Sequence, residues 1–278
     1  MIEIKEVKTL EQVAEIIMDQ KYEPNIKRYR SAYLYRGMPD KDFKLLTSLE
    51  QNCKEKSQVL EKSILRNFIK YAIKEDPSIE LSVWKQLIIG QHHGLPTRLL
   101  DWTYSPLVGL HFAICDENMS KIEEKDSALW KIDLYEIQAL LPDKYKEKLR
   151  EEDAYLYTVD MMQDVVKSLE QYDKDMGKDS IVLLEPPSID QRIINQYSYF
   201  SVMPSGVESL EEFLEKNTVH TTKYIIDKKL KWRIRDMLDQ LNINERVVYP
   251  GLDGLTAWIK RHYYVEYYGA AEPPVRSS

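Results

Sequence analysis

The stretch GQHHGLPTRLLDWTYSPLVGLHFAIC, residues 90–115, is the most unusual in the chain and places a polar cluster between two apolar segments. Gly94 and Pro96 end the helix that the preceding residues predict. The next residues, Thr97–Asp101, are expected to form one short strand. The Ser-Pro pair at 105–106 then supplies a strong N-cap and a proline at the first helical position. The stretch therefore predicts a strand-to-helix turn, where backbone N–H groups favour an anion.

This polar cluster has two interpretations. In the structural one, Arg98 pairs with Asp101, His92 bonds to a buried carbonyl group, and Trp102 belongs to the core. In the functional one, the same side chains line a ligand site at the turn. Side chains alternate along a strand, so Arg98 is expected to face away from Asp101. The residues alone leave both interpretations open.

Hydrophobic periodicity predicts interleaved helices and strands along the rest of the chain. Thr9 and Gln12 form a capping-box pattern that starts the first helix. Strands are expected at Ala32–Arg36, Ala128–Leu134, Ile181–Glu185, Tyr199–Met203 and Tyr224–Asp227, and helices at 55–75, Ile79–Ile89, Tyr135–Leu141, 153–170, Gln191–Gln196, Ser209–Glu215 and beyond Trp232. Without a βαβ order, a repeat or a long linker, the pattern indicates a single α+β domain with a small central sheet and helical flanks. We expect this domain at 30–265, a helical lead-in at 1–29 and a flexible tail at 266–278.

Composition limits the class of protein. Of 278 residues, 43% are hydrophobic and 31% charged, which is enough apolar material for a folded core. With 39 Lys and Arg against 46 Asp and Glu, the net charge is −7. This charge argues against binding to extended nucleic acid, because that affinity comes from cations that neutralise phosphates, but it leaves room for a local basic patch. The 19 Tyr suit half-buried, amphipathic surfaces.

Several classes of site and location are disfavoured. Cys53 and Cys115 match no metal-ligand spacing and are expected to be reduced thiols of a cytoplasmic protein, and no segment predicts a membrane span or signal peptide. His92 and His93 point apart and have no third ligand at a suitable spacing, so no metal is expected. The chain lacks GxGxxG, GxxxxGK[ST], HExxH and GxSxG, which disfavours Rossmann dehydrogenases, P-loop enzymes, zincins and α/β-hydrolases.

Two further segments carry candidate residues. Arg36 ends an aromatic strand, where a guanidinium can bind a phosphate or carboxylate while Gly37 lets the ligand approach the backbone. In PPSIDQRIINQYSYF, residues 186–200, Arg192 and Gln196 lie four apart on one face of a short helix. The alternative for Arg36 is an ion pair on the surface. The alternative for Arg192 and Gln196 is an ordinary exposed Arg–Gln pair on the helix.

Together these stretches resemble the FRG-domain family of mostly bacterial proteins, named for an aromatic-Arg-Gly signature. Here the signature is Tyr35-Arg36-Gly37, followed by QHHGLPTRLLDWT at 91–103 and SPLVGLHFA at 105–113. Arg192, Gln196 and Phe200 continue the resemblance, and KWRIRDMLDQLNINERVVYPGLDGLTAWI at 231–259 looks like the C-terminal part of such proteins. The string at 91–103 makes the resemblance specific.

The order of these motifs is also similar to that of ADP-ribosyltransferases. In those enzymes an Arg on the first strand binds NAD, a Ser/Thr strand shapes the nicotinamide pocket, and a late Glu stabilises the oxocarbenium-like charge. Thr97 and Thr103 would correspond to the second strand. The chain has no Ser-Thr-Ser triplet and neither Glu-x-Glu nor Gln-x-Glu. The resemblance therefore implies that Asp101, Glu185 or Gln196 takes the catalytic place of the late Glu.

The resemblance implies a cytoplasmic protein that binds NAD or a related nucleotide and acts, without a metal, as an ADP-ribosyltransferase-like or NAD-cleaving toxin or phage-defence effector. Arg36 would bind phosphate, His92 and Thr97 would contact the ribose or nicotinamide, and Asp101 would orient Arg98 or His92 or act on the developing charge. The expected ligand-binding set is Arg36, Gly37, Gln91, His92, Thr97, Arg98, Trp102, Thr103 and Arg192. A protein target or partner subunit is also expected. The alternative is a non-catalytic module that binds a nucleic-acid end or a partner protein, and a nuclease is disfavoured because no paired-carboxylate metal site is apparent.

Overall fold

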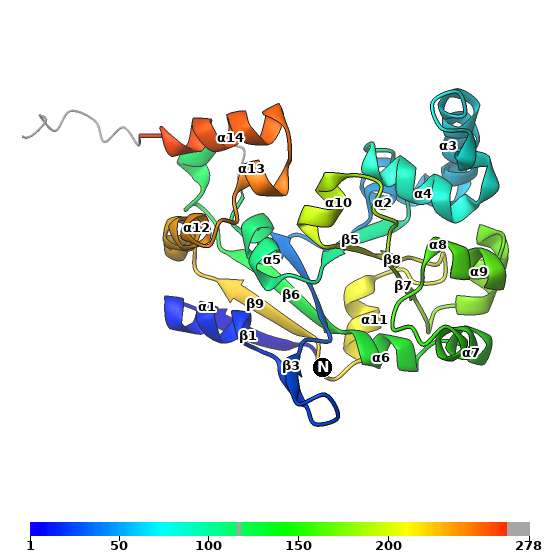
Figure 1. The fold of residues 1–278 in the computed structure, drawn as a ribbon, viewed down its shortest axis with the longest axis horizontal. Coiled ribbons are helices and arrows are strands. Elements are labelled where there is room, and N and C mark those ends of the chain that lie inside the picture. Colours follow the sequence, from blue (N-terminus) through cyan, green and yellow to red (C-terminus); the bar gives the residue numbers. More distant parts are fainter. Residues whose placement is uncertain (116–117, 266–278) are drawn as a thin grey trace, which may run out of the picture.

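The computed structural model describes residues 1–115 and 118–265, so the tail expected at 266–278 lies outside the described residues. The strands are β1 (Glu3–Val7), β2 (Lys21–Glu23), β3 (Arg28–Arg30), β4 (Tyr33–Met38), β5 (Leu99–Thr103), β6 (Ser127–Asp133), β7 (Val182–Leu184), β8 (Ser198–Val202) and β9 (Thr222–Ile226). Within the described ranges, one mixed sheet has the strand order β1-β9-β6-β4-β5-β8-β7, and β2 and β3 form a separate hairpin. Figure 1 shows the sheet running through the centre of the molecule.

The α-helices are distributed along the whole described chain. They are α1 (Leu10–Ile17), α2 (Ser48–Cys53), α3 (Ser57–Ala72), α4 (Val83–His92), α5 (Pro106–Ala113), α6 (Leu134–Ala139), α7 (Asp143–Glu151), α8 (Val159–Val165), α9 (Leu169–Met176), α10 (Gln191–Gln196), α11 (Leu210–Asn217), α12 (Lys231–Gln240), α13 (Glu245–Val248) and α14 (Leu252–His262). The mixture of helices with one sheet confirms the predicted α+β domain. Among the described residues, no helix combines the length and apolarity needed to cross a membrane.

Hydrophobic clusters cover both faces of the sheet. One cluster, which includes Tyr35 and Leu110, joins α1, α5 and α12 to the half of the sheet formed by β1, β9, β6 and β4. A second cluster around Trp84 joins α3, α4 and α7–α9 to β5, β8 and β7, at the opposite end of the sheet in Figure 1. The third cluster contains Leu34 and Trp102 and is completed by α6 and α11. Because successive strand residues point to opposite faces, Leu34 and Tyr35 assign the third and first clusters to different faces.

The ladder between β4 and β5 is open at one end, and this opening positions the candidate site. β4 pairs with β6 along its full length, from Tyr33 to Met38. β4 meets β5 in register at one pair only, Tyr35 with Thr103. β5 instead pairs along its full length with β8. Beyond Tyr35, β4 and β5 therefore form no further ladder pairs with each other. Arg36 is the first residue of β4 beyond this pair.

The N-terminal segment corrects a prediction. Residues 1–29 contain the expected helix α1, with the capping box at Thr9 and Gln12. They also contain β1, which pairs in parallel with β9 at the edge of the sheet, and most of the β2–β3 hairpin. β1 is exposed along most of its length and only Val7 is buried, so its sequence lacks the apolar alternation of a half-buried strand. The segment is thus part of the sheet and not only a helical lead-in.

The predicted helix at 153–170 is also wrong in extent. Asp153 has a positive φ of 49°, which ends the preceding helical segment, and α8 begins only at Val159. Between them Tyr157 forms a bridge to Leu184 of β7. The segment between Asp153 and α8 therefore adds a backbone bridge to the edge of the sheet. The strands predicted near 33, 128, 182, 199 and 224, in contrast, lie within two residues of their expected bounds.

Candidate functional site

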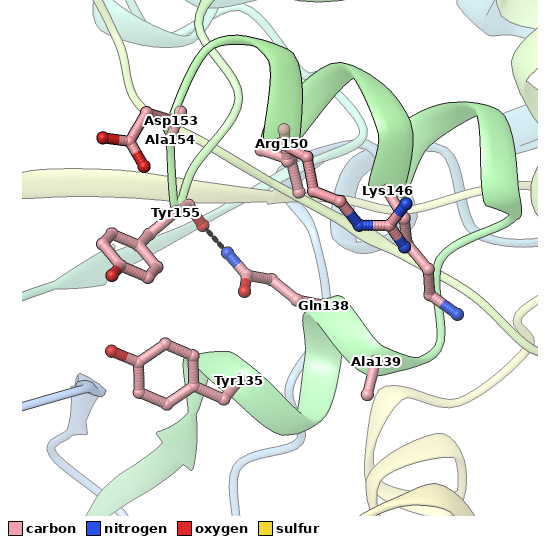
Figure 2. Close-up of a pocket in the computed structure, with 9 residues that line it drawn as sticks. Tyr135, Gln138, Ala139, Lys146, Arg150, Asp153, Ala154 and Tyr155 are labelled. Atoms are coloured by element: carbon pink, nitrogen blue, oxygen red, sulfur yellow. Dashed lines mark hydrogen bonds between the residues drawn. The ribbon is translucent and has the colours of Figure 1, made fainter.

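A pocket of about 290 Å³ lies where the β4–β5 ladder opens. We call it the Arg36 pocket. It is lined by Tyr35, Arg36, Gly37, Pro39, Asp101, Trp102, Thr103, Phe112, Arg192, Gln196 and Ser198. Residues from β4, β5, α5 and α10 therefore meet in one place, although they span more than half of the chain. A larger pocket of about 380 Å³ between α6 and α7 contains none of the residues that the sequence singles out (Figure 2).

Arg36 forms the cationic wall of the Arg36 pocket. Its Nη1 donates to the main-chain oxygen of Asp101 at 2.6 Å and lies 3.7 Å from Asp101 Oδ2. Its Nε is buried without a hydrogen-bond partner in the described chain. Burial lowers the pKa of Arg36, and the carboxylate of Asp101 counteracts this. A guanidinium remains charged in proteins, so Arg36 keeps the capacity to bind an anion.

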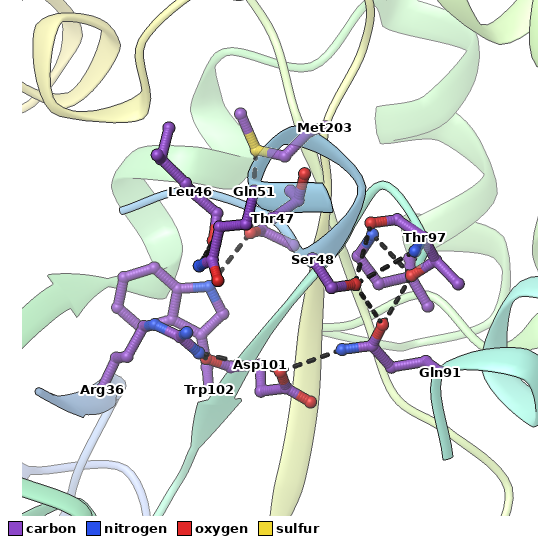
Figure 3. A network of polar contacts seen from close by, with 12 residues as sticks. Arg36, Leu46, Thr47, Ser48, Gln51, Gln91, Thr97, Asp101, Trp102 and Met203 are labelled. Atoms are coloured by element: carbon purple, nitrogen blue, oxygen red, sulfur yellow. Dashed lines mark hydrogen bonds and ion pairs between the residues drawn. The ribbon is translucent and has the colours of Figure 1, made fainter. Parts of the chain in front are cut away.

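Asp101 is held by a network from the preceding turn (Figure 3). Its Oδ2 accepts a hydrogen bond from Gln91 Nε2 at 3.0 Å, and Gln91 Oε1 accepts one from the Thr97 hydroxyl at 2.6 Å. The Thr97 N–H in turn donates to the Ser48 hydroxyl on α2 at 3.0 Å. The side chain of Asp101 is still 55% exposed. The spacing of Gln91, Thr97 and Asp101 thus fixes one accessible carboxylate beside Arg36.

The opposite rim of the Arg36 pocket comes from α10 and is attached to the C-terminal helices. Arg192 places its guanidinium carbon 5.4 Å from the ring centroid of Tyr249. Gln196 Nε2 donates to the main-chain oxygen of Val248 at 3.1 Å. The hydroxyl of Thr103 donates to the main-chain oxygen of Gln196 at 2.7 Å. These contacts connect β5, α10 and α13, and they hold Arg192 and Gln196 at the rim.

Arg98 lies outside the Arg36 pocket and corrects the structural interpretation of the cluster. Its Nε donates to Glu61 of α3 at 2.7 Å, its Nη2 also binds Glu61, and its Nη1 binds Asp173 of α9 at 2.5 Å. The pairing of Arg98 with Asp101 is therefore wrong, as is the expectation that Asp101 orients Arg98. The side chain of Arg98 points toward α3 and α9 of the second cluster. The carboxylates of Glu61 and Asp173 neutralise its charge there.

His92 and Glu185 also lie outside the lining of the Arg36 pocket. His92 Nε2 is 2.6 Å from Asp190 Oδ2, and Asp190 caps α10 by accepting from the Ile193 N–H at 3.0 Å. His92 thereby joins the end of α4 to the start of α10. Glu185 is exposed and follows β7, which β8 separates from β5. Among the three expected catalytic residues, Asp101 and Gln196 line the pocket and Glu185 does not.

Gly37 lines the pocket and also allows α5 to pack against β4. A Cβ on Gly37 would lie 2.0 Å from the carbonyl oxygen of Gly109 and 2.3 Å from the nitrogen of Ala113. Both are backbone atoms of α5, which cannot move independently of the helix. The glycine of the Tyr-Arg-Gly signature is therefore required by this packing, whether or not a ligand approaches its backbone.

Sequence reasoning missed Ser48, Phe112 and Tyr249. Ser48 follows a polar stretch and is recognisable only as a residue near the capping box at Thr47 and Glu50. Phe112 lies in an apolar helix, where an aromatic residue indicates core packing. Tyr249 lies in the C-terminal part and reaches the site only through the tertiary fold. Within the described parts of the chain, no group of three or more His, Cys, Asp or Glu is placed to hold a metal ion.

These features define an α+β domain with an arginine and a carboxylate at an opening of its central sheet. Residues 31–122 match the family model of the FRG domain. The match covers about a third of the chain and includes Arg36, Gln91, Thr97 and Asp101, so the chain contains an FRG domain, which confirms the prediction from the motifs. Comparisons with curated proteins and with solved structures give no match.

Proposed function

We propose that the Arg36 pocket binds NAD or a related nucleotide, and that the protein is an ADP-ribosyltransferase-like or NAD-cleaving enzyme that acts as a cytoplasmic toxin or defence effector. The observation that carries the proposal is the fixed pair of opposite charges, Arg36 and Asp101, at the opening between β4 and β5. Cleavage of NAD requires a positive and a negative group in the site. The positive group binds the pyrophosphate, and the negative group stabilises the ribosyl cation that forms as the bond breaks.

The cations suit the phosphate part of the substrate. Arg36 and Arg192 line the pocket from β4 and α10. Arg36 has a buried Nε without a hydrogen-bond partner among the described residues, and Arg192 is exposed. A planar guanidinium can bind two phosphate oxygens at once. Two such groups from different elements are therefore suited to a pyrophosphate.

The remaining lining suits the nicotinamide and its ribose. Phe112 provides aromatic surface within the pocket, and Trp102, which is almost fully buried, lines its wall. A volume of about 290 Å³ is just below the range for small-molecule sites, which is roughly 300–1,000 Å³. This volume is suited to the nicotinamide-ribose part, and the adenosine half of NAD would extend toward solvent.

Asp101 supplies the electrostatic contribution to the reaction. The bond between the ribose C1′ and the nicotinamide nitrogen breaks, and nicotinamide leaves with the bonding electron pair. The Asp101 carboxylate stabilises the positive charge that develops on the ribose. Water or a nucleophile of a protein target then forms the new bond to C1′ and loses a proton. Gln196 has no negative charge, so the carboxylate of Asp101 is assigned this role.

The test measures nicotinamide release from NAD by the full chain, with cell lysate added to supply a target or partner. Asp101→Asn keeps the main-chain oxygen that binds Arg36, so the pocket should stay assembled while its charge is lost. We expect this variant to release nicotinamide about a hundredfold more slowly or worse. Arg36→Ala should abolish the increase in melting temperature that NAD produces, with only a small change in the melting temperature without ligand.

Asp160→Asn is the matched control, because Asp160 is an exposed carboxylate on α8 that does not line the pocket. It should leave nicotinamide release unchanged. If millimolar NAD neither shifts the melting temperature nor yields nicotinamide, the proposal is wrong. That outcome would favour the non-catalytic module that binds a nucleic-acid end or a partner protein.

A further inference from the structure

A second concave surface combines exposed tyrosine rings with unpaired cations. One pocket of about 400 Å³ lies beside the β2–β3 hairpin, and the pocket of about 380 Å³ between α6 and α7 adjoins it. The two pockets share Tyr135 and Tyr155. We call the combined surface the tyrosine groove. None of its lining residues lines the Arg36 pocket.

The aromatic rings are accessible for stacking. Tyr104, Tyr135, Tyr155 and Tyr199 all line the pocket beside the hairpin. Tyr135 is 44% exposed and Tyr155 is 62% exposed, and their ring centroids lie 5.6 Å apart in an edge-to-face arrangement. Figure 2 shows both rings beside the hollow that α6 and α7 border. Exposed tyrosine faces of this kind are platforms for planar bases.

The cations of α7 differ according to where they point. Lys144 binds Asp175, and Lys148 binds Glu152 and Asp164. Lys146 and Arg150 form no ion pair with a described residue and both line the groove. They lie four residues apart on one helical face, as Figure 2 shows. The side of α7 that faces the groove therefore carries positive charge that no carboxylate among the described residues pairs with.

The hairpin repeats this pattern. Lys21 binds Asp133, whereas Lys27, Arg28 and Arg30 form no ion pair within the described chain. Arg30 lines the groove. Tyr22 and Tyr29 lie across the hairpin from each other, with ring centroids 5.2 Å apart, and both are exposed. Cations and rings therefore continue from the groove onto the hairpin.

The groove also contains the carboxylates of Glu23 and Asp153. They are outnumbered by Arg30, Lys146 and Arg150 within the groove, even though the whole chain carries a charge of −7. An acidic partner peptide would use the cations but would leave the tyrosine rings without a role. A double helix would use the cations, but its bases are stacked inside. A single strand uses both features.

We infer that the tyrosine groove binds a short single-stranded nucleic acid, with bases stacked on Tyr135 and Tyr155 and phosphates bound by Arg30, Lys146 and Arg150. This inference is independent of the proposed NAD chemistry. The acidic net charge restricts the contact to a few nucleotides, because the cations are local.

The experiment measures fluorescence anisotropy of labelled 12-nucleotide oligo(U) and oligo(dT), and of a 12-base-pair duplex, with the full chain. Both single strands should bind more tightly than the duplex, and comparison of the two shows whether RNA or DNA is preferred. With three phosphate contacts, the affinity should fall roughly 20-fold between 50 and 200 mM salt. The double variant Tyr135→Ala with Tyr155→Ala should weaken single-strand binding at least about tenfold. Gln138 bonds to the main-chain oxygen of Tyr155, so this contact survives the substitution.

Lys146→Gln with Arg150→Gln should reduce the dependence on salt to about a third, because two of the three phosphate contacts are removed. The matched control is Arg66→Gln with Tyr71→Ala on α3, an exposed cation and an exposed ring away from the groove, and it should bind like the unaltered chain. Equal binding of duplex and single strand that is insensitive to the tyrosines would overturn the inference. So would no binding at 50 mM salt, or displacement of the oligonucleotide by an acidic peptide with the same tyrosine dependence, which would indicate a protein partner. Arg36→Ala should leave oligonucleotide binding unchanged, so this inference and the proposed function fail separately.

Discussion

Arg36 and Arg98 show how the surroundings of a side chain determine its role. Arg98 is buried and bonded to two carboxylates, Glu61 and Asp173, so its hydrogen-bonding capacity is used within the protein. Arg36 has one main-chain oxygen at 2.6 Å and a carboxylate at 3.7 Å. Its side chain is 20% exposed at the pocket. Of Arg36 and Arg98, only Arg36 can bind a ligand without breaking a buried ion pair.

His111 is buried under the C-terminal helices in a neutral form. Its Nδ1 lies 2.8 Å from Arg235 Nη1. A guanidinium can only donate, so Nδ1 is the acceptor and the ring proton is on Nε2. Burial, together with the charge of Arg235, lowers the pKa of His111 to about 3. The folded protein therefore resists protonation of this ring.

The free energy of unfolding should fall in acid because of His111. The pKa is near 6.5 when the chain is unfolded and about 3 when it is folded, so the unfolded state binds a proton first as the pH falls. Between pH 6.5 and 5, the unaltered chain should lose about 1.5 kcal/mol relative to His111→Gln. Urea unfolding of both proteins at the two pH values measures this difference. Parallel pH profiles would show that His111 is not held neutral.

At the scale of elements, β4 and α5 approach closely because two glycines face each other. Gly37 lies against Gly109 and Ala113, and a Cβ on Gly109 would lie 2.8 Å from Leu129 Cδ1 and 3.0 Å from Tyr35 Cβ. This contact places Phe112 of α5 in the wall of the Arg36 pocket. The glycine of the signature thus sets the distance between the sheet and one side of the site.

Gly37→Ala should destabilise the protein strongly, because the new methyl group meets backbone atoms of α5 at 2.0 and 2.3 Å. We expect a loss of about 3 kcal/mol or more in the free energy of unfolding, or no folded protein. Gly94→Ala is the comparison, since a Cβ there has open space but a φ of +80°. It should cost about 1 kcal/mol from backbone strain alone. Denaturant unfolding distinguishes them, and equal losses would contradict the packing argument.

At the scale of the whole molecule, the C-terminal helices hold the rim of the Arg36 pocket. Asn195 and Gln196 of α10 bond to the main-chain oxygens of Val247 and Val248. The helix α13 is itself fixed by Arg261 of α14, whose guanidinium binds both Glu245 and Asp239. Figure 1 shows α12–α14 together at one end of the sheet. Hydrogen bonds and ion pairs therefore connect α10 through α13 to Arg261, which lies outside the pocket.

Arg261→Ala should loosen this end of the molecule without unfolding the sheet. Glu245 and Asp239 would lose their shared partner, and Glu245 is largely buried. We expect amide hydrogen exchange to accelerate about tenfold or more at 191–196 and 245–248, while β4 and β6 exchange as before. Lys260→Ala, an exposed neighbour on the same helix, is the control and should leave both segments unchanged. Acceleration confined to α14 would show that α10 does not depend on this contact.

The sequence by itself determined the features that depend on neighbouring residues. The capping box at Thr9, the helix Gln191–Gln196 and the strand bearing Arg36 all appear where local patterns placed them. Caps, turns and hydrophobic alternation act within a few residues, so a single chain displays them. The motif at 91–103 also indicates the FRG domain, because it is a continuous string of residues.

Only the tertiary structure decided the partners of Arg98, the position of Glu185 outside the pocket and the attachment of α10 to α13. Arg98 meets Glu61 and Asp173 across separations of 37 and 75 residues, because α3 and α9 pack in one cluster with the start of β5. β1 went unrecognised because an exposed edge strand needs no apolar alternation, and its pairing with β9 is set by the fold as a whole. Long-range pairing leaves no local pattern in the sequence, because the residues that pair are neighbours only after the chain has folded.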